Sequence, residues 1–296
     1  MHIAKFLCVL ITSLSAVASF AANTQVADFA LLDHTGKFHQ ASYYSDHDAI
    51  VILVESSQTL ADKRGRSALS NITALEQKDK VKVMLLSPVA NELRADLQAA
   101  INNSGHQLPA LMDETQLVMQ SLGLTQYGEV IVIDPETMNV LYQGDSTPLQ
   151  SIADLDSVTP TRDALGSAIT LRTPEPVSYS TDIAPILERN CVSCHRDGGI
   201  GPWSMSSHAM VRGWSPMMRE VVMTHRMPPG RIDAHVGKPM SNAGGLSVSE
   251  QQMLIDWIDQ GAEKGPGADP LAELTFGTAA FTLGEPDIVL DVTPQE

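Results

Sequence analysis

The chain has 296 residues, of which 43% are hydrophobic, and its formal net charge is −16 at pH 7. This hydrophobic content supports a packed core and excludes a disordered chain, and the length allows one large domain or two ordinary ones. The acidic balance argues against nucleic acid as the main partner, because binding to phosphates requires a basic surface.

The first residues form a predicted export signal over 1–21. Lys5 provides a short positive start, an apolar run extends from Phe6 to Val17, and small residues follow it. This pattern is typical of a cleaved secretory signal, and the run is short for a membrane span. We therefore expect a soluble protein that is periplasmic or secreted, with no transmembrane segment once the signal is removed.

The signal also limits the cysteine chemistry. Cys8 lies in the apolar run and is removed with it, so the mature sequence keeps Cys191 and Cys194 alone. A structural disulfide elsewhere in the chain and a zinc site of four cysteines are both excluded.

The region after the signal alternates strand and helix patterns. Continuous apolar runs at 49–57 and 81–88 predict strands that are buried on both faces. Helical patterns cover about 60–77 and 91–103, and the stretch 129–144 predicts a hairpin with an Asp-Pro turn. Strands that alternate with helices predict an α/β sandwich.

Two stretches in this region resemble a known family. The entry VADFALLDHTGKFHQASYY and the later LPALMDETQLVMQSLGLTQYGEVIVIDPETMNVLYQG are similar to thioredoxin-like domains of the redoxin or peroxiredoxin type. The resemblance covers roughly 25–148, and it implies a thioredoxin-like sandwich within a domain at 25–170.

The departures from that family exclude its usual chemistry. Where such proteins carry the active cysteine, this chain has Ser56 to Thr59, and Gly128 stands at the position of the family's cis-proline. A serine hydroxyl is a far poorer nucleophile than a thiolate and forms no disulfide. We expect no thiol peroxidase or disulfide reductase activity, and we interpret the domain as a scaffold or docking module. A serine-based activity is a weaker alternative, because no His or Asp partners are evident.

A boundary is predicted at the proline-containing stretch 171–180, and a second domain at 177–265 follows it. Its first helix, with Ser180 or Thr181 as the cap, leads into Cys191, Cys194 and His195 in the order Cys-x-x-Cys-His. Two thiols at this spacing can add to the two vinyl groups of one haem, and the adjacent histidine then serves as the proximal iron ligand.

Two other interpretations of this motif remain open, with less support. A redox dithiol normally follows a strand and opens a helix, whereas this pair follows a helix. A zinc site would need further ligands, from carboxylates or from histidines such as His208, His225 or His235.

The downstream sequence favours haem independently. Met227 precedes Pro228 and Pro229, which can hold a loop rigid against a haem edge. Ser247 and Glu250 then form a predicted capping box for an amphipathic helix that Gly261 can end.

This order of elements resembles a small class I cytochrome c domain, all-α in fold, with one covalent haem c. The resemblance implies that Met227 is the distal ligand and His195 the proximal one, a pair that suits electron transfer. We predict that Trp203, Trp214 and Arg226 line the haem pocket. His225 is the leading alternative distal ligand, and the rival methionines are Met205, Met210, Met217, Met218, Met223 and Met240.

The combination of the two domains resembles a narrower bacterial group. In that group a redoxin-like and a cytochrome c domain precede a copper, ascorbate-dependent monooxygenase-like domain, and here a segment at 266–296 follows as an extension or linker. We expect an exported electron-transfer protein whose partner is a redox protein, for example such a copper domain, rather than a stand-alone enzyme. The alternatives are a haem peroxidase or oxidase with a labile distal ligand, and a haem-based sensor or binding module.

Overall fold

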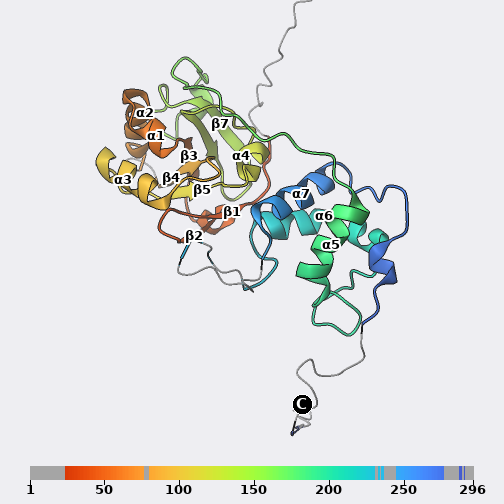
Figure 1. Cartoon of the computed structure of the whole chain (residues 1–296). Helices are drawn as coiled ribbons and strands as arrows, with labels where there is room; N and C mark the ends of the chain where they lie inside the picture. Colours follow the sequence, from red (N-terminus) through yellow and green to blue (C-terminus); the bar gives the residue numbers. More distant parts are fainter. Residues whose placement is uncertain are drawn as a thin grey trace, which may run out of the picture. The chain divides into compact units, whose positions relative to one another are not determined.

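The computed structural model describes residues 24–76, 80–230, 233, 235–236, 245–276, 287–288 and 290 (Figure 1). The predicted signal at 1–21, most of the extension at 266–296 and the rival ligand Met240 lie outside these residues. The chain divides into two compact units between Arg172 and Thr173. Among the described residues, no helix has both the length and the apolar character needed to cross a membrane.

The first unit is built on a five-stranded mixed sheet with the strand order β5-β4-β3-β6-β7. The first three of these strands run parallel and the last two pair antiparallel. Their bounds are β3 (Ala49–Val54), β4 (Val81–Ser87), β5 (Ala110–Met112), β6 (Glu129–Ile133) and β7 (Val140–Asp145). A separate antiparallel hairpin, β1 (Ala30–Leu32) and β2 (Phe38–Gln40), precedes the sheet.

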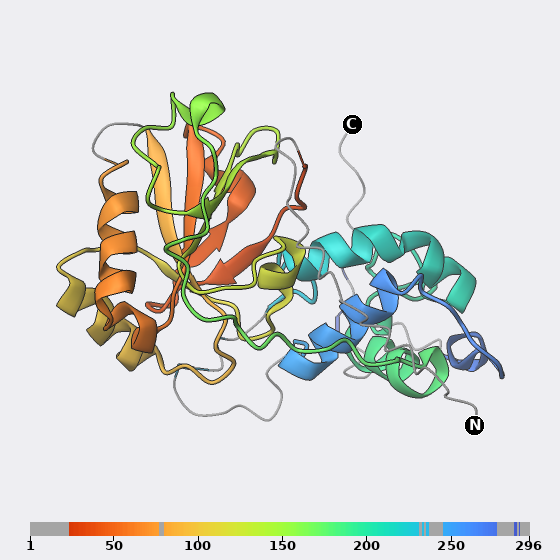
Figure 2. The ribbon, with the colours of Figure 1, turned by 90° about the horizontal axis from the view of Figure 1, so that it is seen from above.

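Helices pack on the sheet through alternate strand residues. Val51 and Leu53 of β3 share a core cluster with residues of α2 (Lys63–Thr73) and α3 (Arg94–Ser104), so both helices cover the same face (Figure 2). The remaining helices are α1 (Ser57–Leu60) and α4 (Leu117–Ser121). The mixed sheet with its helical crossovers confirms the α/β prediction, and its strand order is that of a thioredoxin-like fold.

Two predicted details of this unit are wrong, and one strand was not predicted. The helix expected at 60–77 is two helices, because Ser56 starts α1 one turn earlier and Asp62, in extended backbone, starts α2. The helix expected from position 91 begins at Arg94 instead. Strand β5 was not predicted, since three residues are too few to show a period.

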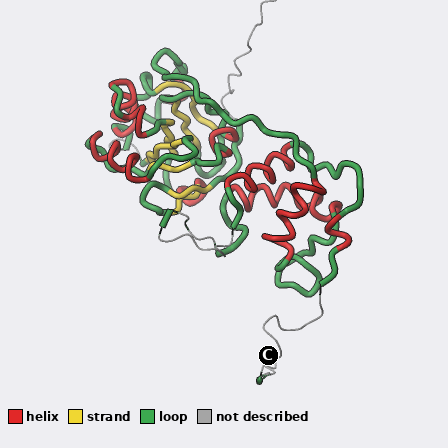
Figure 3. Tube along the Cα trace, in the orientation of Figure 1, coloured by secondary structure: helices red, strands yellow, loops and turns green. Residues whose placement is uncertain are grey.

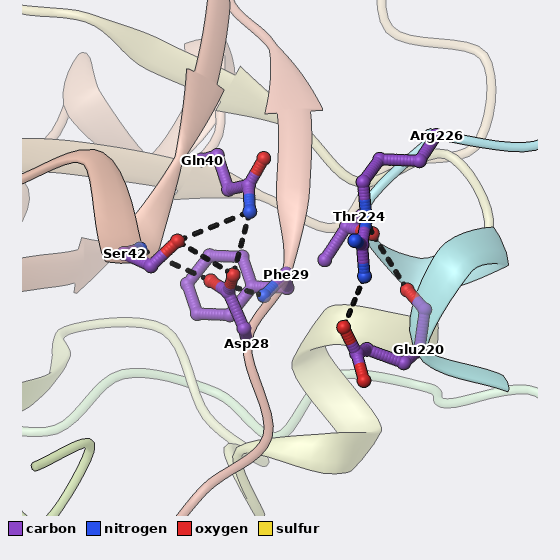
Figure 4. A network of polar contacts seen from close by, with 7 residues as sticks. All are labelled: Asp28, Phe29, Gln40, Ser42, Glu220, Thr224 and Arg226. Atoms are coloured by element: carbon purple, nitrogen blue, oxygen red, sulfur yellow. Dashed lines mark hydrogen bonds and ion pairs between the residues drawn. The ribbon is translucent and has the colours of Figure 1, made fainter. Parts of the chain in front are cut away.

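A polar network fixes the entry of the chain into this unit (Figure 4). The carboxylate of Asp28 accepts hydrogen bonds from the backbone N–H of Phe29, from the Gln40 amide, and from both the N–H and the hydroxyl of Ser42. One side chain therefore ties the segment before β1 to the residues at the end of β2.

The secondary-structure elements in the described part of the second unit are helices and helical turns, and loops connect them (Figure 3). They are α5 (Ala184–Leu187), α6 (His208–Met223) and α7 (Val248–Asp259), with π turns at Tyr179–Ile183 and Glu188–Val192 on either side of α5 and a 3₁₀ turn at Pro270–Glu273. The first helical segment has Ser178 at its N-cap position rather than Ser180 or Thr181, and its first residue, Tyr179, is buried. The Ser178 side chain makes no capping hydrogen bond. The capping box of Ser247 and Glu250 on α7 is confirmed.

An aromatic cluster forms part of the core of this unit. The rings of Tyr179 and Trp257 stack at 5.7 Å, and the His208 ring meets Tyr179 edge-on at 4.7 Å. Asp269 accepts hydrogen bonds from the Tyr179 hydroxyl (2.7 Å) and from the N–H of His208 (2.6 Å). Atom Nε2 of His208 lies 2.8 Å from the carbonyl oxygen of Ala262, so this buried histidine is a core residue.

Candidate functional site

An apolar cavity of about 250 Å³ lies in the second unit. Cys191, Cys194, His195 and Met227 all line it, although 32 residues separate the histidine from the methionine in the printed sequence. The rest of the lining is mostly apolar, with Trp203, Met217, Met218, Val221, Leu246 and Leu254 among its residues. The fold therefore gathers the motif and the Met-Pro element at one apolar cavity.

The two cysteines are placed by the end of the first helical segment. The carbonyl oxygen of Cys191 accepts the N–H groups of both Cys194 (3.1 Å) and His195 (2.9 Å), which closes one turn around the motif. Both thiols are free. Burial, followed by the neighbouring Cys194 and Glu250, raises the pKa of the Cys191 thiol to about 12. A redox dithiol requires an accessible thiolate, so this environment weighs against the dithiol interpretation.

The imidazole of His195 is held in one tautomer. Atom Nδ1 lies 3.2 Å from the carbonyl oxygen of Trp203, which can only accept, so Nδ1 carries the proton and Nε2 keeps its lone pair. Metal-binding histidines are commonly oriented by such a backbone carbonyl. A Cβ atom at Gly201 would lie 2.8 Å from the His195 ring and 2.9 Å from the carbonyl oxygen of Cys194, so glycine leaves the room that the ring occupies.

Met227 reaches the cavity because α6 ends abruptly. The N–H of Arg226 bonds to the carbonyl of Val221 (2.8 Å), and the N–H of His225 bonds to that of Val222 (3.1 Å), which is the Schellman pattern. His225 takes the left-handed conformation at the turn, with φ of 56°. The chain folds back on the last turn of α6, and Met227 then lies at the cavity with its side chain 40% exposed.

Two predicted pocket residues do not line the cavity. Arg226 donates from Nε to the Thr224 hydroxyl and pairs with Glu220, so it closes the end of α6 (Figure 4). Trp214 stacks on Trp203 with ring centroids 5.3 Å apart, and Trp203 is the member of the pair that lines the cavity. Neither residue is among those that line the cavity, and a role for either beside a haem stays a prediction.

The rival ligands differ in position. Met205, Met217 and Met218 also line the cavity, whereas Met210 and Met223 do not. No group of three or more His, Cys, Asp or Glu side chains that could hold a metal ion occurs in the described part of the chain. Since His208 is engaged in the core, the zinc interpretation loses one of its proposed ligands.

In the first unit, the stretch from Ser56 to Thr59, where redoxin-type proteins carry their active cysteine, forms the N-terminal cap of α1. Ser56 caps α1 through a capping box with Thr59, and the N–H of Ser57 donates to the Glu92 carboxylate at 2.7 Å. Next to them Glu55, fully buried, pairs with Arg64 at 2.9 Å. Burial raises the pKa of Glu55, and the bonds from Thr59 and Arg64 counteract this shift.

Sequence reasoning missed the pair of Glu55 and Arg64. The signal that could have found it is an acidic residue at the end of an otherwise apolar buried strand. Two glycines make room for the guanidinium, because a Cβ atom at Gly166 would lie 2.7 Å from it and one at Gly128 would collide with it.

Comparison with known proteins finds solved structures that resemble this chain, but it assigns the chain to no family. No known family description matches the sequence, and no curated protein matches it. A hypothetical protein of Sinorhizobium meliloti is 18% identical over 51% of this chain and 93% of its own, with a TM-score of 0.42. The thioredoxin domain of a thiol-disulfide oxidoreductase from Bacteroides vulgatus is 16% identical over 43% and 93%, with a TM-score of 0.35. Peroxidoxin BcpB from Mycobacterium tuberculosis is 16% identical over 46% and 91%, with a TM-score of 0.33.

Proposed function

We propose that this chain is an exported c-type cytochrome that transfers electrons through one haem attached to Cys191 and Cys194. The observation that carries the proposal is the apolar cavity wall on which both thiols, His195 and Met227 meet. The residues fit the group: the thiols are free to form thioethers, the histidine presents Nε2, and Gly201 leaves space for its ring. When bound, the haem supplies a one-electron couple between ferric and ferrous iron.

Each residue has a distinct task in this proposal. Cys191 and Cys194 hold the group covalently, and His195, oriented by the carbonyl of Trp203, provides the proximal nitrogen. Met227, which lines the same cavity, would provide a soft thioether ligand, and such a ligand would favour the reduced metal and raise the potential. The lining of the cavity is mostly apolar, and a low local dielectric reduces the solvent reorganisation that accompanies a change in charge.

The first unit serves as a scaffold or docking module in this proposal. Its thiol position is occupied by a helix cap and a buried ion pair, so it offers no group for thiol exchange. The partner is a redox protein, for which a copper monooxygenase-like domain is one candidate. Export is part of the proposal, because the sequence combines a predicted secretory signal at 1–21 with the Cys-x-x-Cys-His motif for covalent haem.

The test is a pyridine haemochrome spectrum of the protein made with a cytochrome c maturation system. We expect the spectrum of a haem joined through two thioethers, and denaturation with acid and acetone should not extract it. Cys191→Ser and Cys194→Ser should each leave one thioether, and the double variant should carry no covalent haem. A wild-type protein that is purified without haem from a strain with working maturation machinery would contradict the proposal.

A second function is favoured by one observation. The Met227 side chain is 40% exposed, so the distal ligand is accessible and can be displaced more readily than a buried one. This would suit a peroxidase-like or sensing role. Carbon monoxide added to the reduced protein separates the two functions: an unchanged spectrum indicates the carrier, and rapid ligand binding indicates the open site.

A further inference from the structure

A line of three aromatic rings connects the cavity to the surface of α6. The His195 and Trp203 ring centroids are 5.2 Å apart, and those of Trp203 and Trp214 are 5.3 Å apart with an interplanar angle of 16°. Trp203 lines the cavity, whereas Trp214 is 36% exposed. The line therefore begins at the proposed proximal ligand and ends in solvent.

The row of rings ends at Trp214, on an exposed face of α6. Trp214 lies on α6 between Met210, four residues before it, and Met217, three residues after it, which places the three side chains on one face of the helix. All three are exposed, at 41%, 36% and 50% for Met210, Trp214 and Met217. The third tryptophan, Trp257, is 2% exposed and belongs to the Tyr179 cluster.

We propose that Trp203 and Trp214 form an aromatic electron relay between the His195 side of the cavity and the surface of α6. The proposal rests on the proposed haem function and adds to it the route by which an electron enters or leaves. One electron passes from the reduced iron to a one-electron acceptor protein at the α6 surface. The iron is oxidised and the acceptor reduced, while the two indoles are unchanged after the transfer.

Stacking accounts for the choice of this route. The two indole planes are inclined by only 16° with their centroids 5.3 Å apart, the range of offset-stacked aromatic pairs, and this arrangement brings the two π systems side by side. A wall of aliphatic side chains would separate the cavity from solvent equally well. The two indoles add an aromatic path from the cavity to the surface that an aliphatic wall would lack.

The relay is tested by transient absorption of the haem-loaded protein, with photogenerated tris(bipyridine)ruthenium(III) as the surface oxidant. This oxidant removes one electron from Trp214, and the tryptophan radical is followed by its own absorbance. The reduced iron then returns one electron through Trp203, becomes ferric, and restores the indole. We expect the radical to decay severalfold more slowly in Trp203→Leu, with Trp203→Phe in between, while Met210→Leu decays as the wild type does.

Controls separate the relay from the haem site. Trp214→Leu should lose the early radical but keep the visible spectrum and reduction potential, since this side chain lies off the cavity. The double Cys191→Ser, Cys194→Ser variant should form the radical without fast repair. Equal decay in wild type and Trp203→Leu, in protein whose haemochrome spectrum shows attached haem, would overturn the relay and leave the haem function standing. Absence of attached haem would overturn the function instead.

Discussion

The hydroxyl of Ser215 donates a 2.8 Å hydrogen bond to the carbonyl oxygen of Arg212 in the middle of α6. That carbonyl would bond to the N–H of the residue four positions later, but the residue there is Pro216, which has no N–H. Ser215 therefore satisfies the acceptor that the proline leaves unpaired, and α6 continues through it to Met223.

The first prediction concerns this bond. Ser215→Ala should lower the free energy of unfolding by about 1 kcal/mol, the net value of one hydrogen bond to a partly buried acceptor. Urea unfolding followed by circular dichroism measures the change. Ser215→Thr, which keeps the hydroxyl, is the control, and equal stability of the alanine variant and the wild type would contradict the account.

A second prediction concerns the glycine beneath His195. In Gly201→Ala the new Cβ would collide with the His195 ring and with the Cys194 carbonyl, at 2.8 Å and 2.9 Å. We expect a loss of about 1–3 kcal/mol in stability, typical of overpacking, and a lower yield of attached haem. Gly213→Ala is the matched control, because a Cβ atom at Gly213 would enter open space and alanine favours a helix by about 1 kcal/mol.

Thiol labelling provides a third prediction. Because the pKa of Cys191 is raised to about 12 by burial, this thiol should be alkylated slowly in the folded haem-free protein at pH 8. Its rate should still increase with pH above 9, whereas in urea it should follow an ordinary cysteine. Peptide mass spectrometry after timed iodoacetamide treatment gives the rates. Fast labelling of Cys191 with a midpoint below pH 9 would restore the dithiol interpretation.

The fourth prediction is a pH dependence centred on Asp269. Burial acts to raise the pKa of this carboxyl, but the N–H of His208 and the Tyr179 hydroxyl outweigh it and hold the pKa below the usual 3.8. The bonded carboxylate therefore stabilises the fold fully above pH 3.8, and this contribution is lost as the pH falls through the folded-state pKa. Asp269→Asn should be less stable than the wild type at pH 7, by about 1–3 kcal/mol, and the difference should shrink below pH 3.8. A difference independent of pH would be the contrary result.

The fifth prediction identifies the distal ligand. Met227→Leu should lower the reduction potential and open the iron to carbon monoxide, while Met210→Leu, which changes a methionine outside the cavity, should alter neither. His225→Gly should leave the visible spectrum unchanged and change stability by less than about 1 kcal/mol, since glycine adopts the left-handed conformation without strain. A spectral change in the glycine variant with none in Met227→Leu would identify His225 as the ligand.

Local patterns predicted much of the fold. The apolar run of β3 indicated a buried strand, and the spacing of Ser247 and Glu250 indicated the start of α7, because each signal depends on neighbours along the chain. The break between α1 and α2 was not predictable in this way. It depends on Ser56 and Thr59 forming a cap in competition with a continuous helical pattern.

The sequence indicated which residues could form the candidate site, but not how the chain brings them together. The order Cys-x-x-Cys-His and the Met-Pro element indicated which residues to bring together, whereas the Schellman turn that places Met227 requires a left-handed residue at His225, where propensity favours glycine. Arg226 was expected at the pocket because a basic residue near a haem suits its propionates. Its pairing with Glu220, six residues earlier, depends on the Schellman turn that ends α6, which sequence spacing leaves undetermined.

The buried pair of Glu55 and Arg64 has a consequence for attempts to introduce thiol chemistry into the first unit. In a Ser57→Cys variant, the backbone N–H of the new cysteine would still contact the Glu92 carboxylate, and Glu55 would lie two positions earlier in the sequence. Arg64 compensates the charge of Glu55, whereas the Glu92 carboxylate beside Ser57 disfavours a thiolate, so the new thiol would be a slow nucleophile. Engineering such an activity would require a further substitution at Glu92, while Glu55 has to stay as the partner of Arg64, so a single cysteine is a poor first step toward it.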